Sequence, residues 1–362
     1  MMKIATFGEI MGRFEAEDNK RFTQVMPGNM ALTFAGAEAN VAASLSILGR
    51  KSKYISALPN NIISTSCIKF LKSLDIECDI KLRDEGRFGL YFLESGANQR
   101  PSNVIYDRSW STFSMTNYKE YDFANALKGC NWLHLSGITP SLSKECAEAT
   151  LEIVKEAKKQ NINVSFDLNY RGKLWNWGKD LKKKDLARDT MKKIMPFIDV
   201  VIGNEEDASD VLDIREENND VTSGSLNISS YVNVAKEVKR QYKNVSKVAF
   251  TLRESVSASF NKWGAILYDC NEEKAYFAPE DNGNYTPYEI KNIIDRVGGG
   301  DSFSAGLVFA LTDDKLNNPQ SAISFAVAAS CLCHSIHGDI NYSSLDEVTK
   351  LMNGNGSGRV IR

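Results

Sequence analysis

Three consecutive glycines, Gly298 to Gly300, precede Asp301 and an apolar run that predicts a helix over 299–311. Glycine has no Cβ atom, so the backbone of this segment can approach a ligand closely. The first N–H groups of a helix lack internal partners and lie at the positive end of its dipole. The segment is therefore expected to form an anion hole that suits a phosphoryl group.

Asp301 stands at the rim of this expected anion hole, where the helix dipole should keep its carboxylate ionised. Phosphoryl transfer uses such a group, since an Asp accepts the proton of the attacking hydroxyl while nearby donors stabilise the phosphoryl charge. The residues leave a second interpretation open, in which Asp301 only caps the helix and the glycines form a tight turn.

Other catalytic patterns are missing from the sequence. It has neither the GxxxxGK[ST] phosphate loop nor the GxGxxG and HRD set of protein kinases. The histidines, His134, His334 and His337, form no Ser-His-Asp or HExxH pattern. The seven cysteines are irregularly spaced, which favours reduced thiols over disulfides. Cys331 and Cys333 lie in an apolar helical run and are interpreted as buried thiols rather than metal ligands.

The composition narrows the range of partners. The 362 residues carry 44 Lys and Arg against 46 Asp and Glu, so no strongly basic surface for nucleic acid is expected. The opening MMKIATFGEI predicts a first strand rather than a signal peptide. No stretch reaches the roughly 18 apolar residues of a membrane span. We expect a cytoplasmic protein without nucleic-acid or membrane partners.

Short apolar runs alternate with longer amphipathic stretches along most of the chain. Strands are predicted over 3–8, 53–57, 131–135, 163–168, 200–203 and 245–252, and helices over 37–48, 62–74, 144–160, 184–195, 229–242, 299–311 and 320–336. Two further strands, 265–269 and 274–277, are expected to pair antiparallel. This order predicts an α/β fold with a mainly parallel central sheet, helices on both faces, and ligands at the carboxyl ends of the strands.

Two segments interrupt this alternation. Residues 13–34 and 87–113 alternate apolar and polar side chains without a following helix, and they predict a small β-sheet that covers the site, called the lid below. Residues 1–352 are expected to form one domain with the lid inserted in it. The polar segment 213–227 is interpreted as a surface loop, and 353–362 as a flexible tail.

Three motifs resemble those of the ribokinase-like (PfkB) carbohydrate kinases. Residues 295–306, DRVGGGDSFSAG, resemble the family's DTxGAGD signature, and residues 36–42, GAEANVA, resemble its GGxxxN motif. Residues 204–207, NEED, resemble its NxxE element, and the resemblance runs from Lys3 to about Leu351. It implies a three-layer ribokinase-like fold, ATP as phosphoryl donor, and Mg²⁺.

Finer features resemble one branch of that family, the 2-keto-3-deoxygluconate kinases. They include residues 6–11, 106–108, 167–171, 251–253 and 338–341. The resemblance implies a sugar-acid site at Gly36, Asn40, Tyr91, Tyr106, Arg108, Asn169, Arg171 and Asp301. Two arginines would select an acid over a neutral sugar, since a guanidinium binds a carboxylate through two hydrogen bonds. From the residues alone, the favoured interpretation is that Arg108 is a solvated charge on the lid and that Arg171 caps a surface turn, since most arginines are exposed.

The same resemblance implies the nucleotide and metal sites. ATP would bind at Asn204, Thr251, Arg253, Gly298 and Gly300, Mg²⁺ near Glu206 and Asp207, and a monovalent cation, K⁺, at Asp295. The chain departs from the family where Gly299 replaces the usual Ala and Asp207 the usual Glu. Residues 251–257, TLRESVS, replace its TLGxxG nucleotide loop.

Together these features predict ATP-dependent phosphorylation of an acidic sugar, 2-keto-3-deoxygluconate to its 6-phosphate. Asp301 would be the base, and the amides of Gly298, Gly299 and Gly300 would steady the phosphoryl group. Two alternatives stay open: a kinase of a neutral sugar such as fructose, and a catalytically weak regulatory protein that binds sugar or nucleotide. A homodimer through the lid is also expected, since such a sheet exposes apolar side chains and strand edges.

Overall fold

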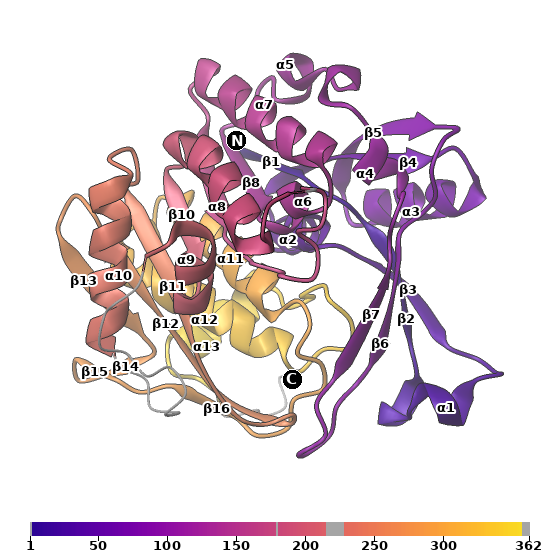
Figure 1. Cartoon of the computed structure of the whole chain (residues 1–362). Helices are drawn as coiled ribbons and strands as arrows, with labels where there is room; N and C mark the ends of the chain where they lie inside the picture. The colour runs from indigo at the N-terminus through magenta and orange to yellow at the C-terminus, as the bar shows by residue number, and fades with distance from the viewer. Residues whose placement is uncertain (1, 179, 215–227, 357–362) are drawn as a thin grey trace.

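The structure, a computed structural model, describes residues 2–178, 180–214 and 228–356. A large twisted sheet forms the centre of the protein (Figure 1). Its strands follow one another in space as β13 (Lys274–Ala278), β12 (Phe260–Asp269), β11 (Lys247–Ser257), β10 (Val200–Gly203), β9 (Asn163–Asp167), β8 (Trp132–Ser136), β1 (Lys3–Phe7), β4 (Lys51–Pro59) and β5 (Ile76–Arg83), with β16 (Tyr288–Ile290) paired to β12.

The strands from β11 to β5 run parallel, and β12 and β13 continue the sheet in antiparallel register. The predicted α/β class, the mainly parallel sheet and the antiparallel pair are therefore confirmed. Successive residues of a strand face opposite sides, so the sheet has an apolar layer on each face. In β11, Val248 and Phe250 pack in one layer and Ala249 in the other.

Helices cover both faces of the sheet. One layer contains α2 (Ala37–Ile47), α3 (Ile62–Ser73), α11 (Gly299–Leu311), α12 (Pro319–Cys333) and α13 (Leu345–Met352). The other contains α7 (Lys144–Lys159), α8 (Lys183–Ile194), α9 (Glu205–Leu212) and α10 (Ile228–Gln241), with the short helices α4 (Thr112–Met115), α5 (Phe123–Ala126) and α6 (Ile138–Ser141). A two-stranded sheet, β14 (Glu280–Asp281) and β15 (Asn284–Tyr285), lies in the connection from β13 to β16.

The lid is a separate four-stranded sheet that projects from the main body (Figure 1). Its strands lie in the order β3 (Ala31–Ala35), β2 (Met11–Glu15), β6 (Leu90–Glu94) and β7 (Asn103–Asp107), and α1 (Phe22–Val25) lies between β2 and β3. Tyr91 is buried on one face, whereas Leu32 and Ile105 are half exposed on the other. The small β-sheet predicted from the alternating pattern is therefore confirmed.

Several elements differ from their predicted extent. Strand β5 and helices α9 and α13 were not predicted, and β11 continues to Ser257 because it pairs with β12 along its length. The segment 251–257 is therefore a strand, not a nucleotide loop. Helix α12 ends at Cys333, three residues early, and the chain then turns at Gly338, whose φ is +92°. Most of the predicted loop 213–227 and of the predicted tail 353–362 lies outside the described residues.

Candidate active site

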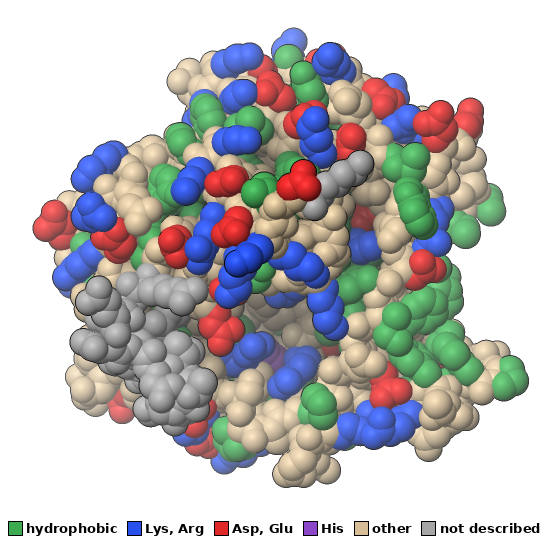
Figure 2. Space-filling model, viewed as in Figure 1, with side chains coloured by type: hydrophobic (Ala, Val, Ile, Leu, Met, Phe, Trp, Pro, Cys, Tyr) green, Lys and Arg blue, Asp and Glu red, His purple; other side chains and the backbone are tan. Residues whose placement is uncertain are grey.

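A cleft of about 840 Å³ lies at the carboxyl ends of the parallel strands, beneath the lid. Figure 2 shows it as a hollow in the middle of the face, with Lys and Arg side chains beside it. The cleft is lined by the predicted residues Gly36, Asn40, Tyr91, Tyr106, Arg108, Asn169, Arg171, Asn204, Glu206, Asp207, Thr251, Arg253, Gly298, Gly299, Gly300 and Asp301. Of the predicted site residues, Asp295 alone lies outside this lining.

The glycine run forms the first turn of α11. Gly298 is the N-cap residue with a φ of +82°, and a Cβ atom there would lie 2.0 Å from the carbonyl oxygen of Asp339, so only glycine fits. A Cβ atom on Gly300 would meet nothing within 4 Å. The amide of Ser302 donates to the carbonyl of Gly298 at 2.8 Å, closing the first helical hydrogen bond. The preceding amides form the donor set of an anion hole at the helix N-terminus.

Asp301 is held from a second helix. The side-chain amide of Asn40, in α2, donates to its Oδ2 at 2.7 Å, and the amide of Gly36 donates to Asn40 Oδ1 at 3.2 Å. The cap of α11 is Gly298, so Asp301 does not act as the N-cap that the sequence left as an alternative. Burial raises the pKa of Asp301 to about 7, against the lowering by Asn40. Burial thus raises this pKa even at the helix N-terminus, so the carboxyl is only partly ionised near pH 7 and fully ionised at higher pH.

Arg108 is a buried residue rather than a solvated lid charge. Its side chain is 8% exposed, and its Nε and Nη2 atoms both donate to Oε2 of Glu9, the former at 2.8 Å. Among the described residues Nη1 has no protein acceptor, and Oε1 of Glu9 is buried without a hydrogen-bond partner. Sequence reasoning missed Glu9, although it lies in the quoted opening motif. Nη1 of Arg108 is therefore free for a ligand, whereas Oε1 of Glu9 is a buried acceptor beside Gly89.

Three further arginines line the cleft: Arg171, Arg253 and Arg296. Within the described parts of the chain, none of them forms an ion pair with an acidic side chain. Arg296 donates to the Asn261 side chain at 3.0 Å, and its Nε is buried without a partner. Burial, and then the neighbouring Arg253, lower the pKa of Arg296. Guanidinium groups that lack counter-ions suit anionic ligands.

Glu38 and Asp167 are further acidic residues of the cleft that were not predicted as site residues. Burial raises the pKa of Glu38 to about 8, although Thr139 donates to its Oε1 at 2.6 Å. Burial, and then the carboxylates of Asp207 and Asp301, raise the pKa of Asp167. Both residues lie inside motifs quoted from the sequence, so their position beside Gly36–Asn40 and Asn169 was the available signal. Carboxyl groups with perturbed pKa values concentrate at functional sites.

The two residues predicted to lie near Mg²⁺, Asp207 and Glu206, differ in hydrogen bonding and exposure. Oδ1 of Asp207 accepts the amide of Tyr170 at 2.9 Å, and Oδ2 accepts the amide of Asn204 at 3.3 Å in a capping box. Burial raises the pKa of Asp207 to about 6. Glu206 is exposed and lines the cleft. No cluster of three or more His, Cys, Asp or Glu residues that could hold a metal occurs in the described ranges. These donors fit Mg²⁺, which binds proteins through one or two carboxylates together with substrate phosphates and water.

His334 lies directly behind the glycine run. Its Nδ1 lies 2.8 Å from the carbonyl oxygen of Ser330, and its ring packs edge-on against Trp263. A Cβ atom on Gly299 would lie 3.0 Å from Cε1 of His334, which leaves little room for a side chain at this position. No histidine was predicted as a site residue from the sequence, yet His334 lines the cleft. All seven cysteines are free thiols, as expected, and Cys333 is buried as predicted, whereas Cys331 is only partly buried.

The chain is similar to known carbohydrate kinases over nearly its whole length. The family model of the pfkB family carbohydrate kinases matches residues 1–346, so the chain belongs to this family. A crystal structure of 2-dehydro-3-deoxygluconokinase from Thermotoga maritima is 39% identical with a TM-score of 0.87, and 98% of each chain is covered. A 2-dehydro-3-deoxygalactonokinase of Haloferax volcanii is 26% identical over 356 residues, with 98% of each protein covered.

An E. coli protein of the same fold was solved in complex with ATP and Mg²⁺, with 19% identity, a TM-score of 0.73, and coverage of 98% of this chain and 100% of that one. Membership of the pfkB family makes the chain an ATP-dependent carbohydrate kinase. In the part of the chain that the structure describes, no helix is long and apolar enough to cross a bilayer.

Proposed function

We propose that the protein phosphorylates the primary hydroxyl of an acidic sugar, converting 2-keto-3-deoxygluconate to its 6-phosphate. The observation that carries this proposal is Arg171, a guanidinium without an acidic partner among the described residues, in the same cleft as Asp301. A sugar carboxylate would supply the missing counter-ion through a bidentate pair. The full-length similarity to the 2-dehydro-3-deoxygluconokinase of Thermotoga maritima supports the same substrate class.

Arg108 completes the carboxylate site from the lid side. Glu9 fixes the guanidinium orientation through Nε and Nη2, which leaves Nη1 for the ligand. Tyr91 and Tyr106, on β6 and β7, line the cleft from the lid and cover the sugar. Water exclusion beneath the lid would limit ATP hydrolysis.

The phosphoryl group is expected to lie at the N-terminus of α11. Asp301 accepts the proton of the sugar hydroxyl, the hydroxyl oxygen forms a bond to the γ-phosphorus, and the bond to the ADP oxygen breaks. The amides after Gly298 donate to the phosphoryl oxygens, and Arg253 and Arg296 balance the charge of the nucleotide phosphates. Mg²⁺, when bound near Glu206, neutralises part of that phosphate charge.

A panel of acceptors in a coupled ATP-turnover assay tests this proposal. We expect turnover with 2-keto-3-deoxygluconate, at a kcat/KM at least about tenfold above those for fructose and ribose. The galactonate epimer belongs in the panel because the Haloferax volcanii relative is named for that substrate. A higher kcat/KM with the epimer would move the assignment to galactonate. Turnover with neutral sugars alone would overturn the acidic-sugar assignment.

The outer face of the lid supports the expected homodimer. Leu32, Phe14, Phe92 and Ile105 are cross-strand partners in one row over all four strands. Leu32 and Ile105 are each 50% exposed, and Figure 2 shows hydrophobic side chains gathered over the lid. We propose that a second copy covers this row. Light scattering should give a dimer mass that falls to the monomer mass in Ile105→Lys, and a monomeric native protein would refute the dimer.

A further inference from the structure

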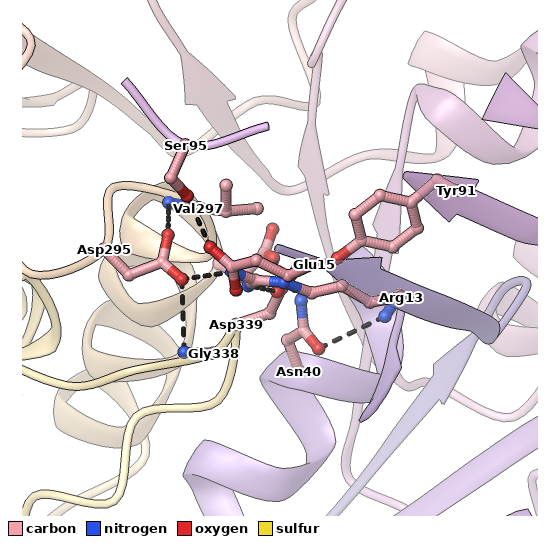
Figure 3. Close-up of polar contacts among 11 residues, drawn as sticks. Arg13, Glu15, Asn40, Tyr91, Ser95, Asp295, Val297, Gly338 and Asp339 are labelled. Carbon is pink, nitrogen blue, oxygen red and sulfur yellow. Dashed lines mark hydrogen bonds and ion pairs between the residues drawn. The ribbon is translucent and has the colours of Figure 1, made fainter. Parts of the chain in front are cut away.

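Arg13, at the centre of lid strand β2, is buried among acidic side chains. It is 1% exposed, its Nη1 donates to Asp339, and its Nη2 donates to Asp295 and Glu15. Figure 3 shows its guanidinium between these carboxylates. Burial by itself lowers the pKa of Arg13, but the carboxylates of Asp339 and Asp295 raise it by more. The net pKa is raised, so the guanidinium stays charged. Arg13 therefore supplies a positive charge that cannot dissociate.

Asp295 was expected to bind a monovalent cation, and its surroundings do not fit one. Its Oδ1 accepts the amide of Val297 at 3.0 Å. Its Oδ2 accepts Arg13 Nη2 and, at 3.2 Å, the amide of Gly338. The residue is 5% exposed. Both oxygens thus face hydrogen-bond donors, and the nearest positive charge is a guanidinium.

The other two carboxylates are also fully engaged. In Asp339, Oδ1 accepts Arg13 and Oδ2 accepts the Tyr91 hydroxyl at 2.7 Å. In Glu15, Oε2 accepts Arg13 and Oε1 accepts the Ser95 hydroxyl. Every carboxylate oxygen around Arg13 therefore has a donor from the chain, as Figure 3 shows. Because these oxygens accept hydrogen bonds from the chain, they are not available as ligands for a bound cation.

The cluster holds the segments that shape the anion hole. Asp295 lies three residues before Gly298, and its carboxylate fixes the intervening amide of Val297. The carbonyl of Asp339 lies against the Cα of Gly298, where a Cβ atom would be only 2.0 Å away. Arg13 belongs to the lid, so one side chain ties a lid strand to both segments beside the first turn of α11.

We propose that Arg13 is a positioning residue that takes the place of a monovalent cation in this kinase. It supplies from the lid the charge that holds Asp295 and Asp339, and phosphoryl transfer consequently needs no K⁺. Removal of this charge would leave buried carboxylates uncompensated, which is more costly than the loss of a surface ion pair. The inference rests on the kinase activity of the family and not on the identity of the sugar.

The native enzyme gives the first test and needs no substitution. Turnover and Tm are measured in the chlorides of K⁺, Na⁺ and tetramethylammonium at equal ionic strength. We expect kcat to agree within about twofold and Tm within about 1 °C, because no cation binds the folded state specifically. A K⁺-specific gain of about tenfold, or a K⁺-specific rise in Tm, would overturn the proposal. The Tm readout needs no sugar, so it separates this outcome from a wrong substrate.

Arg13→Ala gives the second test, because it opens a space of guanidinium size. We expect kcat to fall at least about tenfold, sugar affinity by tryptophan fluorescence to change less than about threefold, and added guanidinium chloride at millimolar concentration to restore part of kcat. Arg21→Ala, which removes an exposed lid arginine paired with Glu94, is the matched control and should not respond. Unchanged kcat in Arg13→Ala, or a loss that guanidinium does not reverse, would refute the role.

Arg13→Lys covers the case in which the alanine variant does not fold. Lysine keeps the charge but cannot bridge two carboxylates as a planar fork does. We expect this variant to fold and to lose kcat at least about tenfold, with its KM for the sugar within about threefold of the native value. A native kcat in Arg13→Lys would show that the fork geometry is dispensable and would contradict the positioning role.

Discussion

The side-chain amide of Asn40 donates a 2.7 Å hydrogen bond to Oδ2 of Asp301, and it thereby joins helix α2 to the first turn of α11. The two residues are 261 positions apart in the chain. The bond leaves Oδ1 of Asp301 as the carboxylate oxygen without a contact to Asn40. A carboxylate fixed in this way can receive a proton from a sugar hydroxyl in one defined direction.

The pH dependence of turnover should report Asp301. Burial raises its pKa to about 7, and a base works only when it is deprotonated, so kcat/KM should fall as the pH drops below about 7. Asp301→Asn should lose at least about a thousandfold in kcat. Asp313→Asn, at the other end of α11, is the control and should keep native turnover. Native activity in Asp301→Asn would exclude it as the base.

Asn40→Ala should move that acid limb to higher pH. The hydrogen bond from Asn40 lowers the pKa of Asp301, so its removal leaves the raising effect of burial unopposed. Less of the enzyme would then carry an ionised base at pH 7, and the loss of kcat/KM should shrink as the pH rises to about 9. A loss that is the same at every pH would show that Asn40 acts on the sugar and not on the base.

Two glycines of the α11 turn should respond in opposite ways to alanine. Gly298→Ala places a Cβ atom against the Asp339 carbonyl at a φ of +82°, and it should destabilise the fold by a few kcal/mol. Gly300→Ala points into open space inside a helix, so stability should be equal or higher by up to about 1 kcal/mol.

Turnover separates these glycine variants further. The methyl group of Gly300→Ala should keep the phosphoryl group from the amides, so kcat should fall at least about tenfold in a well-folded protein. Thermal unfolding and steady-state kinetics on both variants check this pair. Native turnover in Gly300→Ala would contradict the placement of the phosphoryl group at this turn.

Glu9→Gln should increase the rise in Tm that a sugar acid produces. It removes the counter-charge of the buried Arg108 guanidinium, which should lower the free energy of unfolding by about 3 kcal/mol. A substrate carboxylate would replace that charge, so the rise in Tm on adding the acid should be larger in the variant than in the native protein. Fructose should produce no such difference. Equal Tm rises in both proteins would show that the ligand carboxylate does not reach Arg108.

Stability should also depend on the protonation of Glu38. Burial raises its pKa from 4.5 to about 8, so the folded state holds this proton more tightly than the unfolded chain. The free energy of unfolding should therefore fall as the pH rises from about 4.5 to about 8, at up to ~1.4 kcal/mol per pH unit. Glu38→Gln lacks this titration and should gain stability relative to the native protein between pH 5 and 8.5. A difference that does not change with pH would contradict the burial of an ionisable carboxyl.

Much of the fold could be predicted from local patterns. Strand β10 has its predicted bounds because it coincides with a short apolar run. Helix α11 has its predicted bounds because glycines mark its start and an apolar run gives its length. Strand β5 was missed, although its sequence IECDIKLR alternates apolar and polar residues, because no helix follows it. Helix α9 was missed because its first turn is polar, and the NEED residues that form its capping box were interpreted only as a metal motif.

The candidate site was predictable where motifs stand close together in sequence. The residues expected to bind sugar, nucleotide and Mg²⁺ all line one cleft, since parallel strands bring their carboxyl ends to one edge. The ion pairs were not predictable. Arg13 meets Asp339 across 326 positions, and Arg108 meets Glu9 across 99. Such partners depend on how the lid docks on the main domain, and no local pattern encodes that contact.

The kcat/KM of Arg171→Met for an acidic and a neutral acceptor tests the central claim most directly. Native protein and variant are compared with 2-keto-3-deoxygluconate and with fructose, and Arg188→Met, whose arginine pairs with Asp213 outside the cleft, is the control. The charge of Arg171 lowers the pKa of Asp301, so the assay is run at about pH 9, where the base stays ionised in both proteins. We predict a loss of at least about a hundredfold for the acid and of less than about threefold for fructose, since at this pH only the acid loses a charged partner. Equal losses for both sugars would contradict carboxylate recognition by Arg171.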